Sequence, residues 1–140
     1  MPDRYFLDTN IFVYSFDHRS GEKQRKAQNL IQKALNDHSG VVSGQVVQEF
    51  FNVATRKFQP NMTGLEANQY LETVLAPLCE VFASLTLFQS ALSIRDETGY
   101  SFYDSLIVAA AKAANCRYLL SEDLQAGRVI RDLEVRNPFV

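Results

Sequence analysis

The chain has 140 residues with 46% hydrophobic and 21% charged side chains, which fits one globular domain and leaves little room for a second core. No apolar run reaches the roughly 18 residues of a membrane span, and residues 1–4 do not resemble a signal peptide. The formal net charge of -2 gives no indication of a nucleic-acid partner.

The cysteines and histidines offer little for metal or nucleophilic chemistry. Cys79 and Cys116 lie far apart, and neither they nor His18 and His38 stand at the spacing of zinc ligands. Both cysteines adjoin apolar stretches, which predicts buried, reduced thiols and a cytoplasmic location.

Short apolar runs alternate with helical patterns along the chain. In order, the expected elements are a strand at 5–7, a helix at 27–35, a strand at 41–43, helices at 46–54 and 65–75, a strand at 81–83, helices at 87–94 and 101–115, and strands at 118–120 and 133–135. Gly40 is expected to stop the first helix, Pro77 to follow the third, and Thr86 to cap the fourth, while the last strand is placed at an edge. This alternation predicts right-handed crossovers, so residues 1–140 should form one three-layer α/β domain with a mostly parallel sheet.

Two acidic residues directly follow expected strands. Asp8 comes after the first strand and precedes Thr9 and Asn10, and Asp123 follows the fourth strand in the run that begins at Ser121. Ligand sites of open parallel sheets form beyond the carboxyl ends of the strands, where both residues stand. Each alone also fits a helix cap, because Asp, Ser and Asn accept hydrogen bonds from free backbone amides. Both interpretations remain open at this point.

A third acid begins an unusually apolar helix. Ser101 and Asp104 have the spacing of a capping box, with Asp in place of the preferred Glu or Gln. The helix that follows is apolar nearly all round, apart from one stripe of Asp104, Ser105, Lys112 and Asn115. Such a helix is expected to be buried, and an acid in its first turn then needs a partner or a metal ion.

A fourth acid, Glu49, lies on the flank of the expected helix 46–54, which suits either a solvated side chain or one that leans over a pocket rim. Four carboxylates in one pocket would repel one another and have raised pKa values unless cations neutralise them. Mg²⁺ and Mn²⁺ prefer oxygen ligands, so this pattern supports the hypothesis of metal-assisted phosphodiester hydrolysis.

Four short segments carry these acids in order and span nearly the whole chain. They are FLDTNI at 6–11, QEFF at 48–51, YDSLI at 103–107 and LLSEDL at 119–124. Together they resemble the PIN domain, and most closely the VapC-type ribonuclease toxins of bacterial toxin–antitoxin pairs. The resemblance implies an α/β/α PIN-like fold with about five parallel strands. It assigns the catalytic and metal-binding quartet to Asp8, Glu49, Asp104 and Asp123, and supporting roles to Thr9, Asn10 and Ser121.

The same resemblance implies an activity and partners. The cofactor would be Mg²⁺ or Mn²⁺, and water would attack a phosphorus of single-stranded RNA to leave a 5′-phosphate and a 3′-hydroxyl. The expected partners are an RNA substrate, a cognate antitoxin protein, operator DNA reached only through that antitoxin, and a second copy of the chain in a homodimer, with no membrane. Glu122 is adjacent to Asp123, and matching the family segment from Ser121 favours Asp123 as the inward acid.

Other interpretations fit these residues less well or remain as alternatives. Haloacid-dehalogenase-type phosphatases need a second Asp two residues after the first, and this chain has Asn10 there. A glycine fingerprint for nucleotides is unsupported, because the six glycines are scattered. A catalytically weak PIN-like scaffold that binds RNA or protein, and a housekeeping RNase that is not a toxin, are the alternatives. The basic cluster of Arg19, Lys23, Arg25 and Lys26 either tracks an RNA backbone or forms a solvated helix face broken by Glu22.

Overall fold

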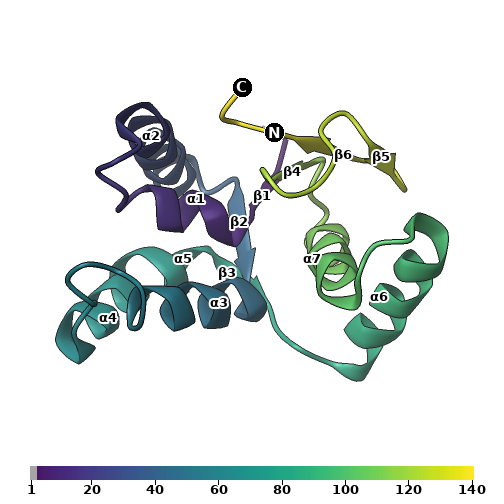
Figure 1. Cartoon of the computed structure of the whole chain (residues 1–140). Coiled ribbons are helices and arrows are strands. Elements are labelled where there is room, and N and C mark those ends of the chain that lie inside the picture. Colours follow the sequence, from purple (N-terminus) through teal and green to yellow (C-terminus); the bar gives the residue numbers. More distant parts are fainter. Residues whose placement is uncertain (1–2) are drawn as a thin grey trace.

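A six-stranded sheet forms the centre of the structure, a computed structural model that describes residues 3–140 (Figure 1). Met1 and Pro2, part of the segment compared with signal peptides, lie outside the described residues. The strand order is β3-β2-β1-β4-β6-β5, and all neighbours are parallel except β5 and β6. The strands are β1 (Tyr5–Leu7), β2 (Gly40–Ser43), β3 (Cys79–Val81), β4 (Tyr118–Leu120), β5 (Val129–Ile130) and β6 (Leu133–Arg136).

Helices cover both faces of this sheet. Figure 1 shows α1 to α5 on one side and α6 with α7 on the other, with the sheet between them. The helices are α1 (Thr9–Tyr14), α2 (Gly21–Asp37), α3 (Gly44–Ala54), α4 (Gly64–Tyr70), the π-helical segment η1 (Leu71–Leu75), α5 (Ala76–Leu78), α6 (Leu85–Thr98) and α7 (Phe102–Ala113). The three-layer α/β architecture predicted from the alternating pattern is confirmed.

Several expected boundaries were wrong for local reasons. The third strand, expected at 81–83, is Cys79–Val81, because the chain leaves the sheet at Phe82, whose side chain is 67% exposed. Ser84, not Thr86, caps α6, since its side chain accepts a hydrogen bond from the Leu87 amide at 3.0 Å. The last expected strand, β6, is not at the edge, because the short antiparallel β5 pairs beyond it.

Gly40 is not the stop of a helix but the first residue of β2. Helix α2 ends at Asp37, and His38 adopts the left-handed conformation with φ 58°. A Cβ at Gly40 would lie 2.4 Å from Ala34 Cβ and 3.0 Å from Leu7 Cδ1, so only glycine lets α2 approach the sheet this closely. Pro77 lies in the first turn of α5, where the missing backbone donor is tolerated.

The core is formed by the inner faces of both helical layers and the sheet. Residues 105–111 of α7 are all buried, as its apolar sequence predicts. Cys116 is a buried free thiol whose pKa burial raises to about 12, while Cys79 is free and half-buried. Among residues 3–140, every helix is too short or too polar to span a bilayer. The fold thus leaves the loops at the carboxyl ends of β1, β2 and β4 as the place where the expected site residues meet.

Candidate active site

Parallel pairing of β1 and β4 brings two of the predicted acids to one edge of the sheet. Leu7 pairs with Leu120, and the Asp8 amide continues the ladder by donating to the Leu120 carbonyl at 3.0 Å. Asp8 and Ser121 are therefore neighbours although 113 positions separate them. The chain after each strand then turns over the sheet edge, which places Asp123 in the same region.

Asp8 is the most enclosed acid of this region, with only 8% of its surface exposed. Its carboxylate accepts a hydrogen bond from Ser121 Oγ at 2.8 Å and another from the Thr9 amide at 2.8 Å, which makes it the N-cap of α1. Burial raises the pKa of Asp8 to about 6, against these two hydrogen bonds, and the charges of Glu49 and Asp123 raise it further. Asp8 therefore caps α1, and this is compatible with a role of its carboxylate in a ligand site.

Glu49 reaches this cluster from α3. Its residue is exposed, yet its Oε1 accepts a hydrogen bond from Thr9 Oγ1 at 2.8 Å. Since Thr9 also gives its amide to Asp8, one residue connects the two acids. The side chain therefore leans over the rim of the site.

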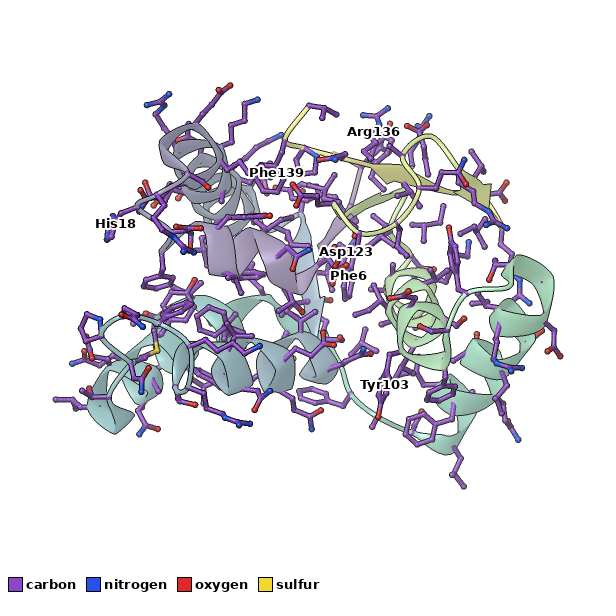
Figure 2. The ribbon with its side chains drawn as sticks, viewed as in Figure 1. Phe6, His18, Tyr103, Asp123, Arg136 and Phe139 are labelled. Carbon is purple, nitrogen blue, oxygen red and sulfur yellow. The ribbon has the colours of Figure 1, made fainter. Side chains whose placement is uncertain are left out.

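Asp123 and Glu122 point to different neighbours. Asp123 accepts a hydrogen bond from Asn10 Nδ2 at 2.8 Å and gives its amide to Ser121 Oγ at 3.2 Å. In the view of Figure 2, Asp123 is seen between α1 and α7. Glu122 instead lies beside Tyr14 and Lys23. The Tyr14 hydroxyl donates to its carboxylate at 2.6 Å and Lys23 Nζ at 2.7 Å, and both hold its pKa below the ordinary value.

Asp104 is placed differently from the other three acids. It is the third residue of α7, half-buried, and its amide donates to Ser101 Oγ at 3.1 Å. Within residues 3–140 its carboxylate makes no hydrogen bond or ion pair. Gln45 Nε2 of α3 donates to the Tyr103 carbonyl at 3.2 Å, which joins the start of α7 to the helix that carries Glu49.

The structure thus brings together Asp8, Glu49 and Asp123 through Thr9 and Ser121. Over the described residues, no three His, Cys, Asp or Glu side chains are arranged closely enough to hold a metal ion as they stand. Like charges repel, and the three carboxylates turn toward hydrogen-bond donors of the chain rather than toward one another. Asp8, Glu49 and Asp123 therefore form an acidic edge of the sheet rather than a preformed metal cage.

Comparison with known proteins identifies the fold family. The PIN domain family profile matches residues 5–131, nearly the whole chain. The chain belongs to the PIN domain family. No curated protein sequence matches it.

Solved structures with the same fold come from toxin–antitoxin systems. A toxin–antitoxin complex from Klebsiella pneumoniae has 17% identity and a TM-score of 0.68 over 96% of this chain and 97% of that one. VapBC2 from Rickettsia felis, bound to a DNA fragment of its promoter, has 20% identity and a TM-score of 0.66 over 95% and 97%. VapC20 from Mycobacterium tuberculosis, a toxin that cleaves the sarcin–ricin loop, has 19% identity and a TM-score of 0.55 over 85% and 91%. At these identities and TM-scores, the likeness shows a shared fold.

The basic cluster near the start of α2 is largely paired in this PIN domain. Lys23 contacts Glu122, Lys26 lies 3.4 Å from Glu22, and Arg19 lies 3.1 Å from Asp17. These contacts favour the solvated helix face over an RNA track. The sequence did not indicate the Gln45–Tyr103 contact or the cavity beside it. Both depend on how α3 and α7 meet in three dimensions.

Proposed function

We propose that this PIN domain is a metal-dependent ribonuclease that hydrolyses single-stranded RNA. The observation that carries the proposal is the acidic edge around Asp8. Within residues 3–140, none of the four predicted acids forms a hydrogen bond or ion pair with a basic side chain, and burial raises the pKa of Asp8 to about 6. A buried carboxylate beside two others, with no basic side chain of the described residues to neutralise them, is typical of a site that binds a cation.

The donor set fits Mg²⁺ or Mn²⁺. It offers carboxylate oxygens without thiolate or imidazole, which is the ligand chemistry that these ions prefer. Asp8, Glu49, Asp104 and Asp123 would hold the ion. Since no three of these side chains stand ready as ligands, binding requires their rotation toward one another. The positive charge of the ion would offset the repulsion between the carboxylates that this rotation increases. When bound, the ion would lower the pKa of water and offset the negative charge that builds on the phosphate.

The remaining side chains have positioning roles in this proposal. Ser121 and the Thr9 amide stabilise the ionised form of Asp8 and fix its direction. Thr9 Oγ1 holds Glu49, and Asn10 holds Asp123. A water oxygen forms a bond to phosphorus while the bond from phosphorus to O3′ breaks. One proton of the attacking water is released and O3′ takes one up, which leaves a 3′-hydroxyl and a 5′-phosphate.

We further propose that the enzyme is the toxin of a toxin–antitoxin pair, acts in the cytoplasm as a homodimer, and is inhibited by a cognate antitoxin. The solved toxin–antitoxin complexes share its fold over nearly their whole length, and one of them is bound to promoter DNA. Operator binding by this chain would accordingly occur through the antitoxin.

A fluorogenic RNA assay tests the activity. The wild type should cleave with Mg²⁺ or Mn²⁺ and stop with EDTA, and Asp8→Ala and Asp104→Ala should each lose about a hundredfold or more, because ligand loss exceeds the effect of losing a supporting group. Equal residual activity in all three proteins would refute the nuclease assignment.

One observation favours the alternative of a catalytically weak scaffold that binds RNA or protein. Among the described residues, no three His, Cys, Asp or Glu side chains are arranged to hold a metal ion. Tight RNA binding without cleavage by the wild type would favour this alternative. Growth arrest on expression of the chain alone, relieved by co-expression of the neighbouring small gene, supports the toxin. An active RNase without arrest indicates a housekeeping enzyme.

A further inference from the structure

A cavity of about 610 Å³ lies between α3, α6 and α7, apart from the acidic edge. Its wall includes Gln48, which directly precedes Glu49, and Tyr103, which directly precedes Asp104. Gln45 also lines the cavity, and its Nε2 donates to the Tyr103 carbonyl at 3.2 Å. The cavity therefore borders the two helices that bring Glu49 and Asp104 to the proposed active site.

Aromatic rings form much of this wall. Phe82 is 67% exposed and Tyr103 is 68% exposed, although both are large apolar side chains. Phe102 lies 6.0 Å from Tyr103 and 6.2 Å from Phe88 between ring centroids. Exposed rings beside a cavity provide faces on which a planar apolar ligand can stack.

Two polar groups on the same wall lack a partner within residues 3–140. Ser43 is 3% exposed, and its Oγ is buried without a hydrogen bond. Gln45 is half-buried as a residue, but its Oε1 is also buried without a hydrogen bond. The Gln45 nitrogen already donates to the Tyr103 carbonyl, so the buried oxygen is the atom of this amide that has no partner among the described residues. A hydroxyl donor and an amide acceptor that are buried and unpaired are stabilised when a ligand edge supplies the missing partners.

We propose that this cavity binds one nucleobase of the RNA, next to the phosphate that is cleaved. Stacking comes from Phe82 and Tyr103. Ser43 Oγ and Gln45 Oε1 are buried at the cavity wall, and a shift of the neighbouring side chains lets them pair with the base edge. A base combines a flat apolar face with adjacent donors and acceptors at its edge, which matches this wall. The inference rests on the proposed function for its substrate, and it makes the cavity a determinant of where the RNA is cut.

Fluorescence of 2-aminopurine, which is quenched by stacking, tests this directly. The probe is a short single-stranded RNA with one 2-aminopurine, titrated with the intact protein in Ca²⁺ in place of Mg²⁺, with gels confirming that the RNA stays whole. The wild type should quench the probe, and Phe82→Ala should weaken its binding about tenfold.

Three controls separate recognition from folding. Ser43→Ala should weaken binding about fivefold while leaving the midpoint of thermal unfolding unchanged, because the hydroxyl has no partner to lose. Leu65→Ala, which is exposed on α4 outside the cavity, should change neither quantity. An RNA with an abasic site at the probe position should bind wild type and Phe82→Ala equally.

The outcomes also distinguish this inference from the proposed function. RNA cleavage that needs Asp8 but shows no probe quenching, or the same quenching in Phe82→Ala, overturns the base site and leaves the nuclease standing. Quenching that Phe82→Ala abolishes, in a protein that never cleaves, supports the base site and refutes the nuclease.

Discussion

Replacement of Asp8 by Asn should stabilise the fold at neutral pH when no divalent metal ion is present, and should lose this effect at about pH 4. Burial raises the pKa of Asp8 from its ordinary value of 3.8 to about 6, with Glu49 and Asp123 adding to the rise. A carboxyl group whose folded pKa is raised holds its proton more tightly in the fold. Its contribution to stability is therefore present below about pH 4 and lost as the pH rises through about 6.

The size of the effect follows from the two pKa values. The interval from 3.8 to about 6 corresponds to about 3 kcal/mol, since each pKa unit is worth about 1.4 kcal/mol. Asn carries no charge, so the free energy of unfolding of the variant does not fall when the pH rises through about 6. Any change in its hydrogen bond with Ser121 is present at both pH values and cancels in the comparison.

Urea unfolding followed by circular dichroism, with EDTA at about pH 4 and about pH 8, measures the difference. Asp96→Asn, which removes an exposed acid of α6, is the matched control. Adding Mg²⁺ should stabilise the wild type more than Asp8→Asn. An Asp8→Asn effect of equal size at both pH values would refute the argument that buried charge at Asp8 destabilises the metal-free fold.

Three further predictions follow from particular contacts. Gly40→Ala should lower the free energy of unfolding by about 1–3 kcal/mol, because the new Cβ meets the side chain of Ala34 on α2. Gly21→Ala should not lower it, because nothing lies within contact distance of a Cβ there. Urea unfolding measures both variants. Asp123→Asn should reduce RNA cleavage strongly, while Glu122→Gln should keep it and change stability by at most about 1 kcal/mol; equal loss in both would contradict the separation of their roles. Thr9→Val should reduce cleavage about tenfold and Thr9→Ser should keep it, because the hydroxyl group at this position holds Glu49 by a hydrogen bond. Equal kinetics in the two variants would count against this role.

The positions of Asp8 and Asp123 could be predicted from the sequence because the physics involved is simple. Alternating strands and helices give a parallel sheet, and its carboxyl ends lie at one edge. The apolar character of α7 likewise predicted its burial. The supporting roles of Thr9 and Ser121 came only from the family resemblance, and their hydrogen bonds to Glu49 and Asp8 agree with those roles.

Other features depend on contacts that a local pattern does not contain. Glu122 and Asp123 have the same chemistry, and their separation follows from Tyr14 and Lys23, more than ninety positions away. Strand β5 has two residues and is too short for any periodicity, so the true edge of the sheet was missed. The cavity beside Gln45 arises from the packing of three helices and has no sequence signature.

The chemistry of the RNA ends is the most direct test of the central claim, that the acidic edge around Asp8 hydrolyses RNA with a divalent metal ion. RNA treated with the purified protein and Mg²⁺ should carry 5′-phosphate and 3′-hydroxyl ends at the cut, and the cuts should disappear with EDTA and in Asp8→Ala. Cuts that end in 2′,3′-cyclic phosphate and persist in EDTA would contradict it, because they arise from attack by the ribose hydroxyl rather than by water.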